Sequence, residues 1–202
     1  MINKDTKLFG SFSSNPGNNG CEFFNEKFLI NSEDAIYKSF YSNNIKKSIE
    51  AALTLGFSGF SVSMPFKSEI LQYLDETDKS VKKIGACNTV IIKNNKLKGY
   101  NTDWKGVYKY LIQHNVKSLS IYGNGGFSKS TQFACEVLEI PYEIITRKNW
   151  KQIPTYEYTF NATPVDIIHK NLIDGRPHTN SGKKLSRLQA LEQYKIYKNE
   201  LS

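Results

Sequence analysis

The chain lacks several features that would place it in a specialised class of protein. No run of about 18 apolar residues is present, so no membrane-spanning helix is expected. The amino-terminal stretch MINKDTKLFG lacks the apolar core of a secretory signal. The three cysteines, Cys21, Cys87 and Cys135, are far apart and show no metal-ligand spacing. We therefore expect reduced thiols in a cytoplasmic protein, with neither a disulfide framework nor a metal site.

Basic residues are plentiful, but no block of five or more occurs. The net charge is +8, from 27 basic and 19 acidic residues. Such a balance alone permits an anionic partner, which could be nucleic acid, a phosphorylated cofactor or a small acid. Because the lysines are scattered, a solvated surface explains them better, and we expect no nucleic-acid partner. The 202 residues, 39% of them hydrophobic, are enough for a hydrophobic core that needs no disulfide or metal to stabilise it.

Hydrophobic periodicity predicts alternating strands and helices in the first half of the chain. The strands are expected at 7–13, 35–40, 57–62, 89–92 and 97–100, and the helices at 20–29, from Asn43 or Asn44 to Gly56, and at 68–74. The first three strands are separated by helical crossovers, which favours a parallel sheet. The last two strands flank a short polar turn and are predicted to form a hairpin. The polar stretch 75–83 receives no assignment.

The second half shows the same alternation. Its strands are expected at 119–121, 142–146 and 156–160, and its helices at 104–112, 127–138 and 182–199. Ser181 is predicted to cap the last helix, on which Gln189 shares a face with Ile196. The segment 165–180 is polar and has no clear assignment. This order of elements predicts an α/β protein with two lobes.

A lysine follows the third predicted strand and offers a candidate for chemistry. Pro65 ends that strand because proline has no N–H for a sheet, and Lys67 comes next. Ligands of open α/β sheets bind at the carboxyl ends of strands. Asp103 follows 36 positions later, and the two side chains could together hold a hydroxyl group and move its proton. An ordinary surface ion pair is the alternative interpretation.

A glycine-rich turn joins the strand at 119–121 to the following helix. Its sequence is Gly123-Asn124-Gly125-Gly126-Phe127-Ser128-Lys129. Strand, glycine turn and helix are the context that a phosphate-binding loop requires, although a plain tight turn would look the same. The next strand ends at Thr146, followed by Arg147 and Lys148. A basic residue there can accommodate a 2′-phosphate and favours NADP over NAD, unless it belongs to a solvated turn.

Eight short motifs now resemble one family, in the family's order. They are SFS (11–13), SVSMPFK (61–67), GACNT (85–89), NTDWKG (101–106), GNGGFSK (123–129), TRK (146–148), NATP (161–164) and LQALEQY (188–194). The chain resembles shikimate dehydrogenase, and more closely the shikimate dehydrogenase-like paralogues. The resemblance implies an NADP-dependent oxidoreductase that interconverts 3-dehydroshikimate and shikimate in aromatic amino-acid biosynthesis, with an activity that could be weak.

The resemblance also implies roles for individual residues. Lys67 and Asp103 match the family's catalytic pair, which binds the hydroxyl group that is oxidised. The residues matching substrate-binding positions are Ser11, Ser13, Ser63, Asn88 and Gln189. Those matching NADP-binding positions are Gly123, Gly125, Gly126, Ser128, Thr146, Arg147, Asn161 and Thr163. We expect a small cyclic hydroxy acid as substrate, no membrane partner, and a monomer or homodimer.

Two departures from the family pattern accompany the resemblance. Ser61 stands where the family usually has asparagine, and the family's His-Ser-x-Ser-Pro is reduced to Ser11-Phe12-Ser13-Ser14. The second half is also shorter, and we attribute the shortfall to the segment after Thr163. The expected domains are a parallel α/β substrate domain at 1–103, on which helix 182–199 packs back, and a shortened Rossmann-like NADP-binding domain at 104–181. A binding protein that keeps the substrate pocket but has lost productive cofactor binding is the alternative.

Overall fold

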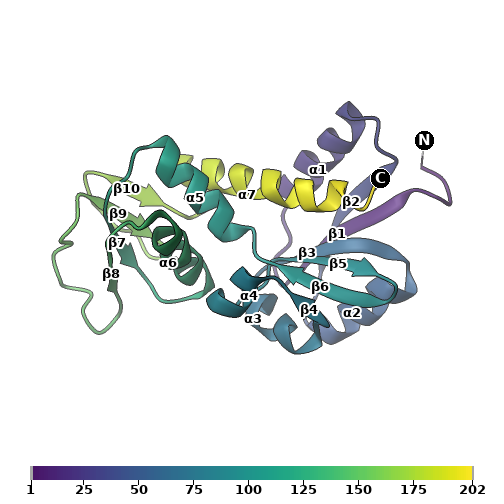
Figure 1. Cartoon of the computed structure of the whole chain (residues 1–202), viewed down its shortest axis with the longest axis horizontal. Helices are drawn as coiled ribbons and strands as arrows, with labels where there is room; N and C mark the ends of the chain where they lie inside the picture. Colours follow the sequence, from purple (N-terminus) through teal and green to yellow (C-terminus); the bar gives the residue numbers. More distant parts are fainter. Residues whose placement is uncertain (1, 202) are drawn as a thin grey trace. The chain divides into compact units, whose positions relative to one another are not determined.

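The computed structural model describes residues 2–201, which form two compact units (Figure 1). Unit 1 contains the chain up to Asn101 together with the residues from Ala190 onward. Unit 2 contains Thr102–Gln189. The last helix, α7 (Asn180–Lys198), contributes residues to both units. The assignment of these units to substrate and cofactor stays a prediction.

Unit 1 is built on a six-stranded sheet of order β2-β1-β3-β5-β6-β4. Its strands are β1 (Lys7–Ser13), β2 (Ala35–Tyr41), β3 (Phe57–Val62), β4 (Glu76–Thr77), β5 (Thr89–Lys93) and β6 (Lys96–Tyr100). The pairings β1–β2, β1–β3 and β4–β6 are parallel, as helical crossovers require. β5 and β6 form the predicted hairpin, so their pairing is antiparallel, and the pairing β3–β5 is antiparallel as well. The lobe is therefore mixed, and the prediction of a parallel sheet holds for β2, β1 and β3.

Local sequence signals explain most of the helices of unit 1. They are α1 (Asn19–Ile30), α2 (Ile45–Thr54), α3 (Phe66–Glu69), the 3₁₀ turn η1 (Ile70–Tyr73) and α4 (Lys79–Ile84). Asn44 caps α2 by accepting a hydrogen bond from the N–H of Lys47. The polar stretch 75–83 contains β4 and most of α4, which the sequence analysis missed. Asp78 caps α4 and left-handed Gly85 ends it, so the signals were present.

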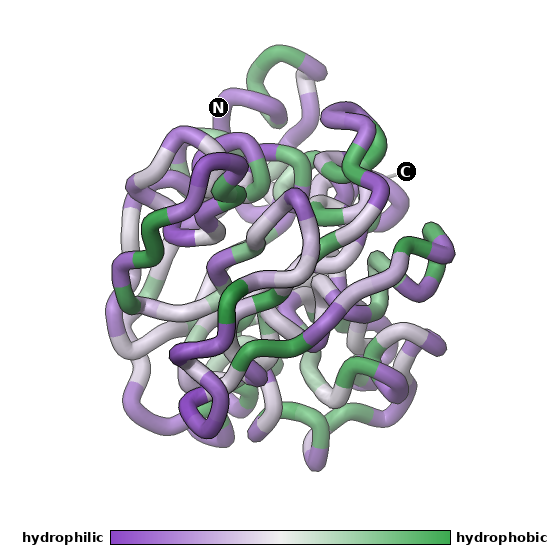
Figure 2. The backbone as a smooth tube through the Cα atoms, turned by 90° about the vertical axis from the view of Figure 1, so that its left-hand side faces the viewer, coloured by the Kyte–Doolittle hydropathy of each residue, from purple (hydrophilic) through white to green (hydrophobic). Residues whose placement is uncertain are grey.

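The two faces of the unit 1 sheet carry separate hydrophobic clusters. Phe12 and Phe60 pack with residues of α2 on one face. Phe9 and Tyr37 pack with residues of α1 and the end of α7 on the other face. Successive residues of a strand point to opposite faces, which explains why neighbouring positions of β1 enter different clusters. Hydrophobic and hydrophilic segments accordingly alternate along the tube in Figure 2.

Unit 2 is built on a four-stranded parallel sheet of order β10-β9-β7-β8. Its strands are β7 (Leu119–Tyr122), β8 (Tyr142–Ile145), β9 (Tyr158–Asn161) and β10 (Leu172–Asp174), and its helices besides α7 are α5 (Asp103–Gln113) and α6 (Gly126–Leu138). The strands take the places of the first, second, fourth and fifth strands of a dinucleotide-binding sheet. The prediction of a shortened Rossmann-like sheet agrees with this order.

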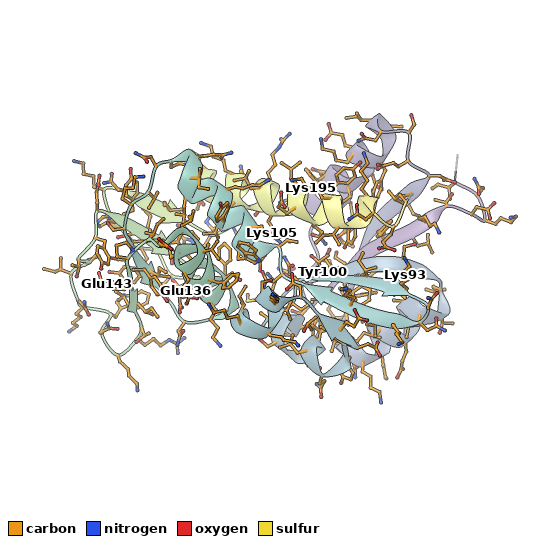
Figure 3. All side chains as sticks on the ribbon, in the orientation of Figure 1. Lys93, Tyr100, Lys105, Glu136, Glu143 and Lys195 are labelled. Atoms are coloured by element: carbon orange, nitrogen blue, oxygen red, sulfur yellow. The ribbon has the colours of Figure 1, made fainter. Side chains whose placement is uncertain are left out.

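Two connections in unit 2 are made without helices or strands. Residues 146–157 join β8 to β9, and residues 162–171 join β9 to β10. The shortening therefore lies before β9 as well as after Thr163. Glu143, labelled in Figure 3, anchors the first connection by accepting hydrogen bonds from Ser120, Gln152 and Thr155.

The segment 165–180 and the start of α7 differ from the sequence analysis. Strand β10 lies in this segment and was missed, because its apolar stretch is only three residues long. Helix α7 begins at Asn180, so the prediction that Ser181 caps it was wrong. The Ser181 hydroxyl instead exchanges hydrogen bonds with the backbone N–H and carbonyl of Asp174, both at 2.8 Å. No helix in the described part of the chain is long and apolar enough to cross a bilayer.

Candidate functional site

A row of hydroxyl side chains crosses the unit 1 sheet near the carboxyl ends of its parallel strands. Strand register aligns Ser11 with Ser39 on β2 and with Ser61 on β3, and Ser61 with Thr89 on β5. These four residues are called the hydroxyl row. Aligned residues of adjacent strands point to the same face. Ser13 lies two residues beyond Ser11 on that face, so it extends the polar surface toward the strand ends.

Lys67 and Asn88 are placed by hydrogen bonds of the backbone. Lys67 lies in α3, and its carbonyl accepts a 2.7 Å hydrogen bond from the N–H of Cys87. Asn88 follows directly, and its carbonyl accepts from the N–H of Val62 at the end of β3. The Asn88 side chain is only 2% exposed and accepts a hydrogen bond from the Thr89 hydroxyl. Ser63 is exposed just beyond β3. Three predicted site residues, Lys67, Ser63 and Asn88, thus lie at the same end of one sheet.

Asp103 and Gln189 both belong to unit 2, where α5 and α7 pack closely. Asp103 is the first residue of α5 and is 1% exposed. A carboxylate at a helix N-terminus is stabilised by the helix dipole. One turn further on, a Cβ added at Gly106 would lie 2.9 Å from the Gln189 backbone nitrogen. The absence of a side chain at Gly106 therefore allows the contact that brings α7 beside the start of α5.

A buried hydrogen-bond network surrounds Ser61, and the sequence analysis did not find it. The Ser61 hydroxyl lies 2.6 Å from the Tyr37 hydroxyl and 2.6 Å from Gln193 Nε2. The same Nε2 lies 2.7 Å from the Tyr197 hydroxyl. Burial raises the pKa of Tyr37 to about 12 and the pKa of Tyr197 well above its usual value, so both phenols are neutral. The four-residue spacing of Gln189, Gln193 and Tyr197 was the available signal, because it places them on one stripe of α7.

The glycine turn of unit 2 has the geometry of a phosphate-binding loop. Gly123 has a φ of 104°, and an added Cβ would lie 2.9 Å from Thr163 Cγ2, so only glycine fits. The Ser128 hydroxyl donates to the Gly123 carbonyl at 2.7 Å and closes the turn. Gly125 and Gly126 lie at the start of α6, where backbone N–H groups are available to an anion. These residues fit a pyrophosphate.

The end of β8 carries the predicted basic residue. Asn149 accepts hydrogen bonds from the backbone N–H and hydroxyl of Thr146, which fixes the turn. Arg147 and Lys148 are exposed, and residues 147–152 line a shallow hollow of about 360 Å³. Trp150 packs edge-to-face against Tyr122 with ring centroids 5.1 Å apart. A cationic hollow beside the second strand of this sheet fits a 2′-phosphate.

Asn161 and Thr163 are hydrogen-bonded to each other at the end of β9. The side-chain Oδ1 of Asn161 accepts from the N–H of Thr163 at 3.0 Å and from its hydroxyl at 2.7 Å. The Asn161 amide donates to the Val165 carbonyl. Both residues therefore shape the start of the β9–β10 connection, and their predicted contact with a cofactor stays a prediction.

An ion-pair network closes the same connection. Arg176 donates to both oxygens of Asp174 and to Asp166, with its Nη2–Asp174 and Nη1–Asp166 contacts both at 2.6 Å. Burial opposes the charge on Asp174, but the hydrogen bonds from Arg176 outweigh it, so the pKa of Asp174 is below its usual value. Arg176 thus fastens residues 162–171 to the end of β10.

Two cysteines and the possible metal ligands were compared with what thiol or metal chemistry requires, over the residues that the structure describes. Burial raises the pKa of both Cys87 and Cys135 to about 12, so neither is a ready nucleophile. Within residues 2–201, His, Cys, Asp and Glu side chains form no group of three suited to a metal ion.

Comparisons with known proteins agree with this arrangement. Residues 20–90 match the family model of the shikimate dehydrogenase substrate binding domain. A shikimate dehydrogenase-like protein of Haemophilus influenzae is 38% identical over 134 residues, which are 64% of this chain and 49% of that protein. A shikimate dehydrogenase (NADP(+)) of Methanococcus vannielii is 37% identical over 148 residues, covering 70% of this chain and 51% of that protein. The chain thus spans about half the length of the curated relatives it matches.

A comparison with solved structures points to the same family as the comparison of sequences. The solved structure of a shikimate 5-dehydrogenase-like protein matches with a TM-score of 0.83 and 25% identity, over 100% of this chain and 95% of that chain. Sequence and fold together show that the chain is a homologue of the shikimate dehydrogenase family and carries the substrate-binding domain of that family.

Proposed function

We propose that the protein is an NADP-dependent oxidoreductase that interconverts 3-dehydroshikimate and shikimate. The observation that carries the proposal is the polar surface at the strand ends of unit 1, inside and beside the region that matches the substrate-binding family model. The relatives named shikimate dehydrogenase (NADP(+)) support the choice of reaction and cofactor.

The hydroxyls and amides of unit 1 suit a cyclic hydroxy acid. A carboxylate only accepts hydrogen bonds, and the serine hydroxyls of Ser11 and Ser13 can donate to it. Ser63 and Asn88 can each both donate and accept, as ring hydroxyls require, and so can Gln189 of unit 2. A site built to bond hydroxyl groups rejects analogues that lack them, since its buried polar groups are then left unpaired.

Lys67 and Asp103 are proposed to bind the reacting hydroxyl and handle its proton. The lysine can donate to the oxygen as negative charge develops there, and the carboxylate can accept the proton that leaves. Bound NADP⁺ would supply the chemistry of hydride acceptance. Ser128 and the glycines at 123, 125 and 126 would hold its pyrophosphate, whereas Thr146 and Arg147 would hold the 2′-phosphate. Asn161 and Thr163 would shape the neighbouring loop.

A binding protein without turnover is a second candidate, favoured by one observation. Two of the three crossovers in the unit 2 sheet, residues 146–157 and 162–171, lack a helix, so fewer elements surround the predicted cofactor site. This candidate predicts binding of shikimate without oxidation.

Two measurements on the unaltered protein decide between the candidates. Ultraviolet absorbance follows NADPH formation from shikimate and NADP⁺ at alkaline pH, and calorimetric titration follows the binding of each ligand. Turnover together with binding of both ligands supports the dehydrogenase. Shikimate binding without turnover supports the binding protein, and failure to bind shikimate contradicts both.

A further inference from the structure

Gln193 of α7 uses only one end of its side-chain amide within the protein. Its Nε2 lies 2.6 Å from the Ser61 hydroxyl and 2.7 Å from the Tyr197 hydroxyl, so both of its hydrogens are used. Its Oε1 has no hydrogen-bond partner among residues 2–201. The residue is only 4% exposed, and yet this oxygen is not sealed from solvent. Buried polar groups are normally paired, so the unpaired end points to a partner outside the chain.

The orientation of the Gln193 amide does not change this arrangement. The hydroxyls of Ser61 and Tyr197 can donate as well as accept, so an amide with its nitrogen and oxygen exchanged would make the same two contacts. In either orientation one end of the amide is held by these two hydroxyls and the other end is unpaired. A hydroxyl group of a ligand can pair with either end, because it also both donates and accepts.

The packing of α7 on the unit 1 sheet places Gln193 near the carboxyl ends of the strands. The Tyr197 ring lies 4.5 Å from that of Phe9, between centroids, and a Cβ added at Gly59 would lie 3.3 Å from Tyr197 Cε1. Gln193 precedes Tyr197 by one helical turn and contacts Ser61, which is two residues further along β3 than Gly59. Gln193 therefore lies between Tyr197 and the strand ends, where the predicted substrate residues of unit 1 are found.

We propose that Gln193 is a binding residue for a cyclic hydroxy acid, and that the unpaired end of its amide forms a hydrogen bond with one ring hydroxyl of the ligand. The proposal rests on the proposed function and deepens it, because it adds a residue that selects for that hydroxyl. Ser61 and Tyr197 already hold the amide, so little side-chain freedom is lost when the ligand binds. A ligand that lacks the hydroxyl leaves the amide end unpaired inside the site and binds less tightly.

The test compares shikimate with three analogues, each of which lacks one of its ring hydroxyls. Calorimetric titration of the full chain gives, for each analogue, the ratio of its dissociation constant to that of shikimate. The ratios are measured in the wild type and in Gln193→Met, which has a side chain of similar length without an amide. One ratio should fall by about fivefold in the variant, as for one hydrogen bond between uncharged groups, and the other two should stay within about twofold of the wild type.

The ratios separate contact with the ligand from structural support, because a general loosening of the site weakens shikimate and analogue alike. Gln193→Asn is a second variant, which keeps an amide but shortens the side chain by one methylene and so withdraws the unpaired end. It should lower the same ratio, and it decides the matter alone if Gln193→Met fails to fold. Tyr194→Phe is the matched control, because Tyr194 lies on the same helix but bonds Glu33 at 2.7 Å. It should leave all three ratios unchanged.

Each outcome has a distinct meaning. A fall in one and the same ratio in the Gln193 variants, with the control unchanged, supports the proposal. Unchanged ratios in these variants show that water alone satisfies the amide, and they overturn the proposal while leaving the proposed function intact. A fall in more than one ratio, or a wild type that binds every analogue as tightly as shikimate, also overturns it. If the wild type does not bind shikimate, the proposal and the proposed function fail together.

Discussion

Replacing Gly106 by alanine should destabilise unit 2 even though alanine is the better helix former. Within a helix such as α5, alanine is favoured over glycine by about 1 kcal/mol. The added Cβ would lie 2.9 Å from the Gln189 backbone nitrogen and 3.1 Å from both its Cα and its Cβ. These atoms cannot rotate away, so α7 must move. Because the contacted atoms include backbone, the overpacking should cost the upper part of the usual range, about 2–3 kcal/mol, which leaves a net loss of about 1–2 kcal/mol.

The assay for this loss uses the two tryptophans of the chain as reporters. Trp104 and Trp150 both lie in unit 2, so their fluorescence in urea follows the unfolding of that unit. Gly125→Ala is the control, because nothing lies within 4 Å of an added Cβ there. It should change the free energy of unfolding by less than about 1 kcal/mol. An unchanged or raised stability of Gly106→Ala would refute the argument that the α5–α7 contact needs glycine.

Three further predictions concern charged groups. Hydrogen bonds hold the pKa of Glu143 below 4.5 against the effect of burial, so its contribution to stability is complete above that pH and is lost as the pH falls through the folded-state pKa. The difference in urea midpoint between wild type and Glu143→Gln should therefore shrink on acidification, and a constant difference would contradict this. Arg147→Ala should weaken binding of NADP⁺ by about tenfold and of NAD⁺ far less, as calorimetry can measure; equal losses would rule out a 2′-phosphate contact. Arg176→Met should lower the urea midpoint of unit 2 more than Asp166→Asn, because the side chain of Asp174 is 7% exposed and that of Asp166 is 89% exposed. Equal midpoints would show that the buried pair contributes little.

Sequence patterns predicted the elements that have strong local signals. β1 and β3 begin and end at the predicted residues, because each is a short stretch of apolar, β-prone residues bounded by loop residues or proline. The cap at Asn44 and the left-handed glycine at Gly56 explain why α2 was predicted well. β4 and β10 were missed because each is short and owes its form to pairing with another strand. α4 was missed although Asp78 and Gly85 mark its two ends in the sequence.

The candidate site also contains residues that local sequence marks and residues that it does not. Single residues such as Ser11, Lys67 and Arg147 could be predicted, because motifs and strand ends mark them in the sequence. The network of Ser61 could not, since it joins β2, β3 and α7 across more than 130 positions of the chain. Spacing along α7 gives the stripe that contains Gln193, but only strand register shows which hydroxyl it meets. The shortening before β9 was likewise hidden, because loop residues have no periodicity to count.

The most direct test of the account is the rate of NADPH formation from shikimate and NADP⁺ in the wild type, Lys67→Ala and Asp103→Asn. A general acid or base typically contributes about a hundredfold or more to the rate. We predict that each variant loses at least that factor, while calorimetry shows shikimate binding within about tenfold of the wild type. Turnover in the wild type that persists unchanged in both variants would contradict the roles given to Lys67 and Asp103.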